Sequence, residues 1–392
     1  MRLIPLTTSR TAAARALLAG ALLIGPLAGC TAKEATKTAS GTDSRTPITV
    51  DASDTDCVLS ATQASTGPST FAVTNNGTKV TEFYVYGKGE RVMGEVENIS
   101  PGLQRKLIVN LTEPGTYRTA CKPGMIGDGI RKDFTVTGEA VPAGTDLKFQ
   151  RAAQDYKRYV NSQAEALVPA TEAFATAVKA GDVAQAKALY PTSRTYWERI
   201  EPVAESFPND LDPRVDLREA DLEPGQKWTG FHRLEKDLWV SGLLADSGAV
   251  ADQLVADVKE LAAGVKSPEW TVDPPQIAGG AQGLLDEIAV SKITGEEDIF
   301  SHTDLWDFNA NIEGSQTAVA SVRPILDERD AELGKRVDER FSAVEALLAK
   351  YRQGDGFVLY DTVTEPQRQE LSRAIDALSK EVSQVQGVVA PQ

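Results

Sequence analysis

The N-terminal part of the chain alternates between apolar and polar residues with the period of two that is typical of half-buried β-strands. Turn signals such as Asn75-Asn76-Gly77 separate the alternating segments. Short strands at regular spacing predict a β-sandwich over residues 47–137. The segments that carry the alternation are 48–52, 69–74, 81–86, 105–111, 115–120 and 132–136.

A second pattern begins after residues 138–145, a stretch with glycine and proline that we interpret as a linker. Apolar residues then recur at intervals of three and four, which predicts amphipathic helices and no strand. Residues 146–392 are therefore predicted to form an all-α helical bundle, and the fold class is α+β multidomain. The predicted helices are 156–180, 184–207, 227–245, 248–265, 275–293, 303–333, 334–352 and 365–386.

The first 29 residues are predicted to be a signal peptide. Three arginines flank or precede a short apolar run, and Leu27-Ala28-Gly29-Cys30 matches the cleavage box of bacterial lipoproteins. Cys30 is then the lipidated residue, and the polar stretch 30–46 is a flexible tether. This pattern predicts an exported lipoprotein on the outer face of the cytoplasmic membrane, in the periplasm or at the cell surface.

Charge narrows the range of partners. Without the three arginines of residues 1–29, 38 of the 41 basic residues remain against 56 acidic residues, a net charge of −18. A chain this acidic repels nucleic acid, so no nucleic-acid partner is expected, whereas cations are attracted.

Two cysteines remain beyond Cys30, namely Cys57 and Cys121. In an exported protein such a pair forms a disulfide or, alternatively, takes part in a metal site, and the sequence leaves both readings open. Glu82, on a predicted strand, is a carboxylate candidate for a harder ion such as iron.

The segment from Glu113-Pro114-Gly115-Thr116-Tyr117 to Cys121-Lys122-Pro123-Gly124-Met125 resembles the last strand and metal loop of the cupredoxin family. A blue-copper site needs two histidines, and this part of the chain contains none. The remaining candidate metal ligands of the β domain are Cys57, Cys121, Met125 and Glu82.

The chain contains only two histidines, and one of them, His232, precedes Glu235 by three residues. On a helix these two side chains share a face, and the apolar residues around them turn that face inward. A zinc peptidase would show two histidines four residues apart, which is absent here. His302 lies 70 residues further on, and we interpret it as a loop residue rather than a ligand.

Gly230-Phe231-His232-Arg233-Leu234-Glu235 resembles the GxHxxE signature of the imelysin-like proteins, a helical-bundle family once described as peptidases. The segments 284–289, 292–297 and 301–308 are similar to its EfeO-type iron-uptake branch, which also carries a cupredoxin-like domain first. The resemblance implies an extracytoplasmic iron-binding protein that holds Fe2+ or Fe3+, with copper or zinc as alternatives. It also implies work with an iron permease and a haem peroxidase.

The same resemblance assigns His232 and Glu235 as metal ligands. Related bundles complete the site with carboxylates from later helices, which makes Glu287 and Glu370 the next candidates because both lie on apolar stripes. Spacing alone does not separate Glu287 from its neighbour Asp286. Asp304 and Asp307 fit ligands and fit first-turn acids that complement a helix dipole, so they stay open.

We therefore expect a non-enzymatic iron-binding component of an uptake system that delivers iron to a permease. Two alternatives remain. The first is a metallopeptidase of the imelysin class. The second is a non-catalytic ligand-binding lipoprotein in which the histidine–glutamate pair is structural.

Overall fold

The computed structural model describes residues 46–141, 146–207, 211–222 and 224–391. The predicted signal peptide 1–29, the lipidation site Cys30 and nearly all of the tether 30–46 lie outside the described residues. The same is true of residues 142–145, which form half of the predicted linker.

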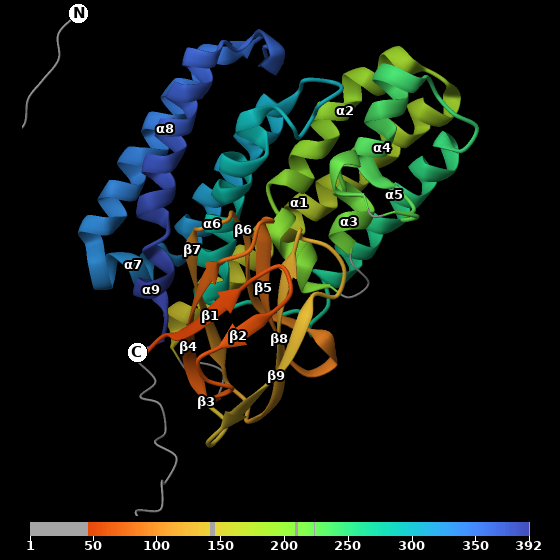
Figure 1. Cartoon of the computed structure of the whole chain (residues 1–392). Coiled ribbons are helices and arrows are strands. Elements are labelled where there is room, and N and C mark those ends of the chain that lie inside the picture. The colour runs from red at the N-terminus through yellow and green to blue at the C-terminus, as the bar shows by residue number, and fades with distance from the viewer. Residues whose placement is uncertain (1–45, 142–145, 208–210, 223, 392) are drawn as a thin grey trace, which may run out of the picture. The chain divides into compact units, whose positions relative to one another are not determined.

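The N-terminal strands form two sheets, as the period of two predicts (Figure 1). The first sheet has the order β2-β1-β4-β7 and consists of β1 (Ile48–Ala52), β2 (Cys57–Leu59), β4 (Gly67–Asn75) and β7 (Gln104–Leu111). The second has the order β3-β9-β8-β5-β6 and consists of β3 (Gln63–Ser65), β5 (Thr81–Tyr86), β6 (Val92–Ile99), β8 (Gly115–Pro123) and β9 (Ile130–Thr137). Most pairs are antiparallel, whereas β1 with β4 and β3 with β9 are parallel.

The apolar faces of the two sheets pack together and form the core of this domain. Phe71 of β4 contacts Phe83 of β5 and Phe134 of β9, with ring centroids 5.3 and 5.5 Å apart. A disulfide between Cys57 on β2 and Cys121 on β8 joins the two sheets through the same core. The predicted β-sandwich is thereby confirmed.

Strand β5 is buried on both of its faces. Phe83 and Val85 point into the sandwich core, so the alternate residues Glu82, Tyr84 and Tyr86 point away from it. Those three side chains face the helical half of the chain, where Tyr84 meets Glu205. Glu82 thus places a buried carboxylate on the face of β5 that is turned toward the helices, which is a suitable position for a metal ligand.

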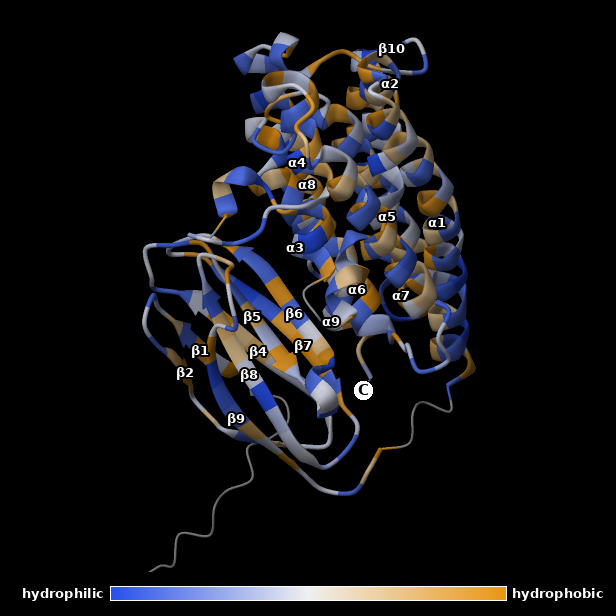
Figure 2. Cartoon of the chain, turned by 90° about the vertical axis from the view of Figure 1, so that its right-hand side faces the viewer, coloured by the Kyte–Doolittle hydropathy of each residue, from blue (hydrophilic) through white to orange (hydrophobic). Residues whose placement is uncertain are grey.

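The remaining elements are helices apart from one short hairpin, which confirms the predicted bundle (Figures 1 and 2). Residues as bulky as Trp197 and Phe308 are fully buried in its core. The helices are α1 (Leu147–Ala180), α2 (Val183–Glu198), α3 (Leu211–Asp216), α4 (Gly230–Lys236), α5 (Ser247–Gly264), α6 (Pro274–Val290), α7 (Asp304–Leu348), α8 (Glu365–Val382) and α9 (Val385–Val389).

Several boundaries differ from the prediction. Helix α7 runs through Gly334, where two helices were expected, and only Asp330 leaves helical geometry. Helix α2 ends at Glu198 rather than at 207, because Pro202 has no N–H to bond the Glu198 carbonyl, and a 3₁₀ helix, Glu201–Ser206, follows. A two-residue hairpin, β10 (Arg352–Gln353) with β11 (Gly356–Phe357), interrupts a region predicted to be purely helical.

Helix α6 packs against strands β6 and β7 and joins the two halves of the chain. The Gln276 side chain donates a hydrogen bond to the Met93 carbonyl at 2.8 Å, and Asn98 donates one to Glu287. Asp286 pairs with Arg105 at 3.6 Å. Both acids of α6 are therefore directed toward the β domain.

Candidate metal centre

The start of α4 is fixed by a close backbone approach at Gly230. Its φ of 87° lies in the left-handed region, and a Cβ atom there would lie 2.2 Å from the Val215 carbonyl oxygen. Only glycine fits this contact, which presses the first turn of α4 against the end of α3. Asp216, the last residue of α3, thereby comes beside His232.

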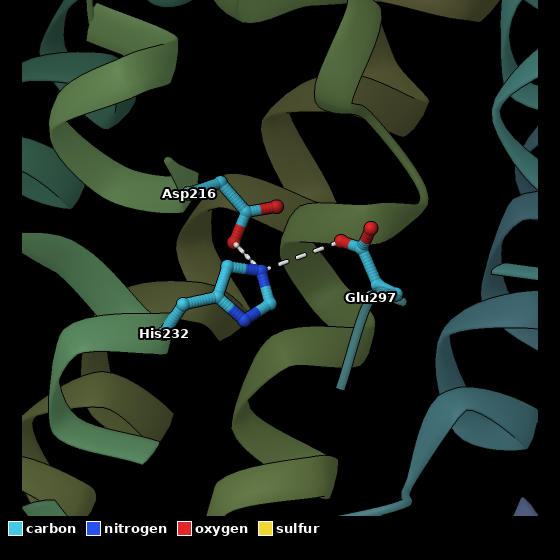
Figure 3. Close-up of side chains that lie close together, drawn as sticks. All are labelled: Asp216, His232 and Glu297. Atoms are coloured by element: carbon cyan, nitrogen blue, oxygen red, sulfur yellow. Dashed lines mark ion pairs between the residues drawn. The ribbon is translucent and has the colours of Figure 1, made fainter. Parts of the chain in front are cut away.

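His232 lies at the centre of four buried carboxylates. Its Nε2 atom is 3.4 Å from Asp216 Oδ1 and 3.4 Å from Glu297 Oε1, as Figure 3 shows. Its Nδ1 atom is 3.3 Å from Glu235 Oε2 and 3.8 Å from Asp298 Oδ1. We call these five residues the His232 cluster, and all are at most 8% exposed.

Two overlapping sets of ligand atoms in this cluster have the spacing of a metal site. Asp216, His232 and Glu297 form one set, and His232, Glu235 and Asp298 form the other, with the ligand atoms of each within 4.8 Å of one another. Nε2 of His232 has no hydrogen-bond partner among the described residues. One imidazole with several carboxylates is a donor set that suits iron, manganese or zinc.

Glu235 is also tied to the backbone of the loop that supplies Glu297 and Asp298. Its Oε1 atom accepts hydrogen bonds from the Phe300 and Ser301 amides at 3.0 and 2.7 Å. These contacts hold the loop against α4, and they leave Oε2 directed at His232. Glu235 thus assembles the cluster as well as contributing to it.

Arg194 of α2 supplies buried positive charge to the same cluster. It is fully buried, it hydrogen-bonds Asp216 and Glu198, and its Nη2 atom lies 3.1 Å from Glu297. Its Nε atom lies 3.4 Å from Asp307. Three acids of the His232 cluster, Asp216, Glu297 and Asp298, are therefore shared between a guanidinium and an imidazole, and without such pairing their burial would be costly.

The electrostatics place a proton on His232 in the metal-free chain. Burial and then the Arg194 charge lower the pKa of His232, but the Asp216 charge and the adjacent carboxylates of Glu235 and Glu297 outweigh them and raise it to about 10. Burial raises the pKa of Glu297, yet Lys292 and His232 hold it well below its ordinary value. A metal ion at Nε2 would have to displace this proton.

A second acidic group lies on the outer face of β5 and β6. Glu95 and Glu97 alternate along β6 and so share a face, and with Glu205 they bring carboxylate oxygens within 4.8 Å of one another. Tyr84 donates a hydrogen bond to Glu97 at 2.9 Å. Glu82 lies on the same face of β5, and we call Glu82, Glu95, Glu97 and Glu205 the Glu95 cluster.

Positive charge is scarce in the Glu95 cluster. Lys122 Nζ lies 3.6 Å from Glu82 Oε2, and burial nevertheless raises the pKa of Glu82 to about 7. Burial, followed by the neighbouring carboxylates, raises the pKa of Glu95 and of Glu97 well above the ordinary value. These groups hold protons that a bound cation would replace.

A cavity of about 960 Å³ connects the surroundings of the two clusters. All four residues of the Glu95 cluster line it, and so do Asp216 and Glu297 of the His232 cluster. Glu287, Asp212 and Met125 also contribute to its wall. An ion in the cavity therefore meets carboxylates of both clusters.

The structure separates the predicted ligands of the helical half. His232 and Glu235 lie together as predicted. Glu287 lies on the cavity wall, paired with Lys292 and Asn98, rather than beside His232. Glu370 was predicted wrongly: it is exposed on α8 and pairs with the exposed Lys350, because its apolar neighbours define a stripe that it flanks.

The acids left open at the start of α7 have different positions. Asp307 joins the buried network through Arg194, and Asp304 accepts a hydrogen bond from the Asp298 amide at 3.3 Å. Burial and the Asp298 charge raise the pKa of Asp304 to about 8. His302 is half-buried, with a φ of 59°, and it is in neither of the two candidate sets around His232.

The predicted thiolate ligands of the β domain are excluded. Cys57 and Cys121 form a disulfide, so neither sulfur is available as a thiolate. Met125 lies in the turn after β8 and lines the cavity, but a lone thioether beside carboxylates is a poor set for copper. Of the β-domain candidates, Glu82 remains in a plausible ligand group.

Comparison with known proteins gives the family. The imelysin family model matches residues 152–385, and the cupredoxin-like domain model matches residues 20–136. The iron uptake system component EfeO of Escherichia coli O157:H7 is 41% identical over 348 residues, which cover 87% of this chain and 91% of that protein. The chain belongs to the imelysin family.

Within the family, the chain is similar to the EfeO proteins, as the segments 284–289, 292–297 and 301–308 and the order of the two domains predict. EfeO of Escherichia coli K12 and EfeO of Shigella flexneri are each 40% identical over the same length, with the same coverage of both chains. Reduced auracyanin from Roseiflexus castenholzii matches 24% of this chain and all of its own, at 15% identity and a TM-score of 0.21. That likeness is too weak to support an inference.

Proposed function

We propose that the chain is the extracytoplasmic iron-binding component of an iron uptake system, which captures iron and delivers it to a membrane permease. The observation that carries this proposal is the His232 cluster, in which one imidazole faces four buried carboxylates. The printed names of the relatives, which are iron uptake components, support the choice of iron.

The donor set explains why iron suits the cluster. Carboxylates favour hard cations and imidazole favours borderline ones, and Fe2+ and Fe3+ accept both. Zinc and copper share part of this preference and are the competing ions. Binding releases the proton of His232, so affinity for iron falls as the solution becomes more acidic.

The Glu95 cluster is the second proposed iron position. It is all carboxylate, with Tyr84 at its edge, and thus favours the harder Fe3+. Because the cavity touches both clusters, the β domain can pass an ion to the helical half without release into bulk solvent.

The location follows from the N-terminal signal and the anchor at Cys30. No helix within the described residues is long and apolar enough to span a membrane. The lipid would hold the chain at the membrane, beside the permease that receives iron and the haem peroxidase that handles ferrous iron. We place no nucleic acid among its partners, because the net charge is strongly negative.

A peptidase is the second candidate function, since the matching family model carries the name of a peptidase class. Burial argues against it. His232 is 2% exposed and Glu235 is fully buried, so a polypeptide substrate has no approach to these side chains. Glu235 also accepts two backbone hydrogen bonds at Oε1 and directs Oε2 at His232, so both of its oxygens face groups of the chain.

Metal content tests the proposal. Iron is titrated anaerobically into the wild-type mature chain and into the His232→Ala and Glu235→Ala variants, and bound iron is measured after gel filtration. We expect both variants to lose at least about tenfold in affinity. Unchanged affinity in both would favour a structural pair, and casein cleavage that depends on Glu235 would favour the peptidase.

A further inference from the structure

Lys292 carries a buried positive charge that lies among several carboxylates and is hydrogen-bonded to none of them. It begins a 3₁₀ turn (η5, Lys292–Thr294) directly after α6, and its side chain is fully buried. Its Nζ atom makes no hydrogen bond of acceptable geometry with the described residues. Four carboxylates surround it at 3.2 to 3.7 Å, namely those of Glu198, Glu201, Glu287 and Glu297.

These four acids, which we call the Lys292 bay, come from separate parts of the chain. Glu198 ends α2, Glu201 begins the next turn, Glu287 belongs to α6, and Glu297 lies in the loop before α7. Nothing in the local sequence requires them to meet. The fold brings them together around one compact positive charge.

Arg194 shows by contrast what a structural counter-ion looks like. It forms directed hydrogen bonds with Glu198, Asp216 and Glu297, which fix the geometry of those acids. Lys292 contributes charge without such bonds, as a metal ion does, because an ammonium is a point charge on a flexible stem. The oxygens of the Lys292 bay thus surround a single positive charge, whereas the oxygens near Arg194 are aligned with individual N–H groups of its guanidinium.

The Lys292 bay lies between the cavity and the His232 cluster. Glu201, Glu287 and Glu297 line the cavity, and Glu297 is also 3.4 Å from His232 Nε2. Glu287 in turn receives a hydrogen bond from Asn98 of the β domain. Glu297 thus borders the cavity, His232 and Lys292 at once, so an ion bound beside it meets a carboxylate that Lys292 already neutralises.

We propose that the Lys292 bay is a third cation position and that Lys292 is a built-in competitor for the transported ion. The ammonium and the metal ion compete for the same four carboxylates, so Lys292 weakens metal binding next to His232 and favours release. In the absence of metal it keeps the acids neutralised and the fold intact. This inference rests on the proposed function and adds the residue that sets its affinity.

The test removes the ammonium and measures affinity for Mn2+, a hard divalent probe that electron paramagnetic resonance counts directly. Lys292→Met keeps the length of the side chain and removes its charge. We expect Mn2+ to bind at least about tenfold more tightly than to the wild-type chain. Lys335→Met, which alters an exposed lysine paired with Glu332, is the control and should leave affinity close to wild type.

A second comparison guards against misfolding of the first variant. Glu201 Oε2 has no hydrogen-bond partner within the described residues, so Glu201→Gln offsets the lost lysine charge with little disturbance. The double variant Lys292→Met/Glu201→Gln should bind Mn2+ at least about tenfold more tightly than Glu201→Gln alone. Equal affinities in this pair would overturn the role of Lys292.

The outcomes separate this inference from the proposed function. If the wild-type chain binds iron and removal of Lys292 leaves Mn2+ affinity unchanged, the proposed role of Lys292 is wrong and the proposed iron site is unaffected. If the wild-type chain binds no iron and the Lys292→Met variant binds Mn2+, the competitor stands and the proposed function is wrong.

Discussion

The His232 cluster and the Glu95 cluster are both groups of acids around one cavity, but they neutralise their charge in different ways. The first has Arg194 and the imidazolium of His232 in contact with its carboxylates. The second has Lys122 beside Glu82, and its acids hold protons because their pKa values are raised. We therefore expect a cation to compete with fixed counter-ions in the His232 cluster and with protons in the Glu95 cluster.

The largest effect is expected from removing the positive charge that neutralises the carboxylates of the His232 cluster. Arg194→Met leaves its carboxylates buried without their guanidinium, and we expect a loss of about 3–5 kcal/mol in the free energy of unfolding. Urea denaturation of the metal-free protein measures it. Arg323→Met, which removes a partly exposed arginine paired with Asp327 and Asp338, is the matched control and should cost less than about 1 kcal/mol. Equal losses in the two variants would show that the buried ion pairs contribute no more to stability than the partly exposed ones.

The next effect concerns the scaffold of the Glu95 cluster. Replacing Cys57 and Cys121 together by serine removes the link between the two sheets, and we expect a loss of about 2–5 kcal/mol in the free energy of unfolding. Iron affinity of the folded variant should stay at the wild-type value, since the sulfurs are not ligands. A large drop in iron affinity at a temperature where the variant is fully folded would restore the thiolates as ligands.

The two clusters should contribute to the stability of the fold over different pH ranges. A carboxyl group with a raised pKa binds its proton more tightly when folded, so stability falls as pH rises from about 4.5 through the raised value, about 7 for Glu82. For His232 the stabilisation is complete below about 6.5 and is lost as pH rises toward about 10.

Melting temperatures of the metal-free chain between pH 5 and 9 measure both windows. The Glu82→Gln variant should flatten the fall between pH 5 and 7, and the His232→Gln variant should flatten the fall above pH 7. Melting temperatures of the wild-type chain that rise from pH 5 to pH 9 would contradict the account of both clusters.

The smallest effect is expected at Glu370, which is exposed and far from the buried network. Glu370→Gln should change the free energy of unfolding by less than about 0.5 kcal/mol, and iron affinity should not change. Isothermal titration with ferrous iron checks the second part. A measurable loss of iron affinity would return this residue to the ligand set.

Much of the fold could be read from periodicity, because alternation and helical spacing report which face of each element is buried. His232 and Glu235 were found for the same reason, since residues three positions apart on a helix lie on the same face. Asp216 and Glu297 were missed, because they lie 16 and 65 residues from His232 and meet it only in the fold. The one local signal was Gly230, whose backbone contact with α3 places Asp216.

Glu95 and Glu97 were missed for a different reason. Their alternation along β6 is visible in the sequence, but two acids on one face of a strand usually indicate a face in water. Their burial comes from helices that follow much later in the chain, including the turn that carries Glu205. The error at Glu370 is the converse, because an acid at the border of an apolar stripe was taken to lie within it.

The central claim is that His232 binds the metal, and the presence of only two histidines allows a direct test. Electron spin-echo envelope modulation of bound Mn2+ should show imidazole nitrogen coupling in the wild-type chain. The His302→Gln variant should keep this coupling, and the His232→Gln variant should lose it. Coupling that persists in His232→Gln, or that is absent from a metal-loaded wild-type chain, would contradict the account.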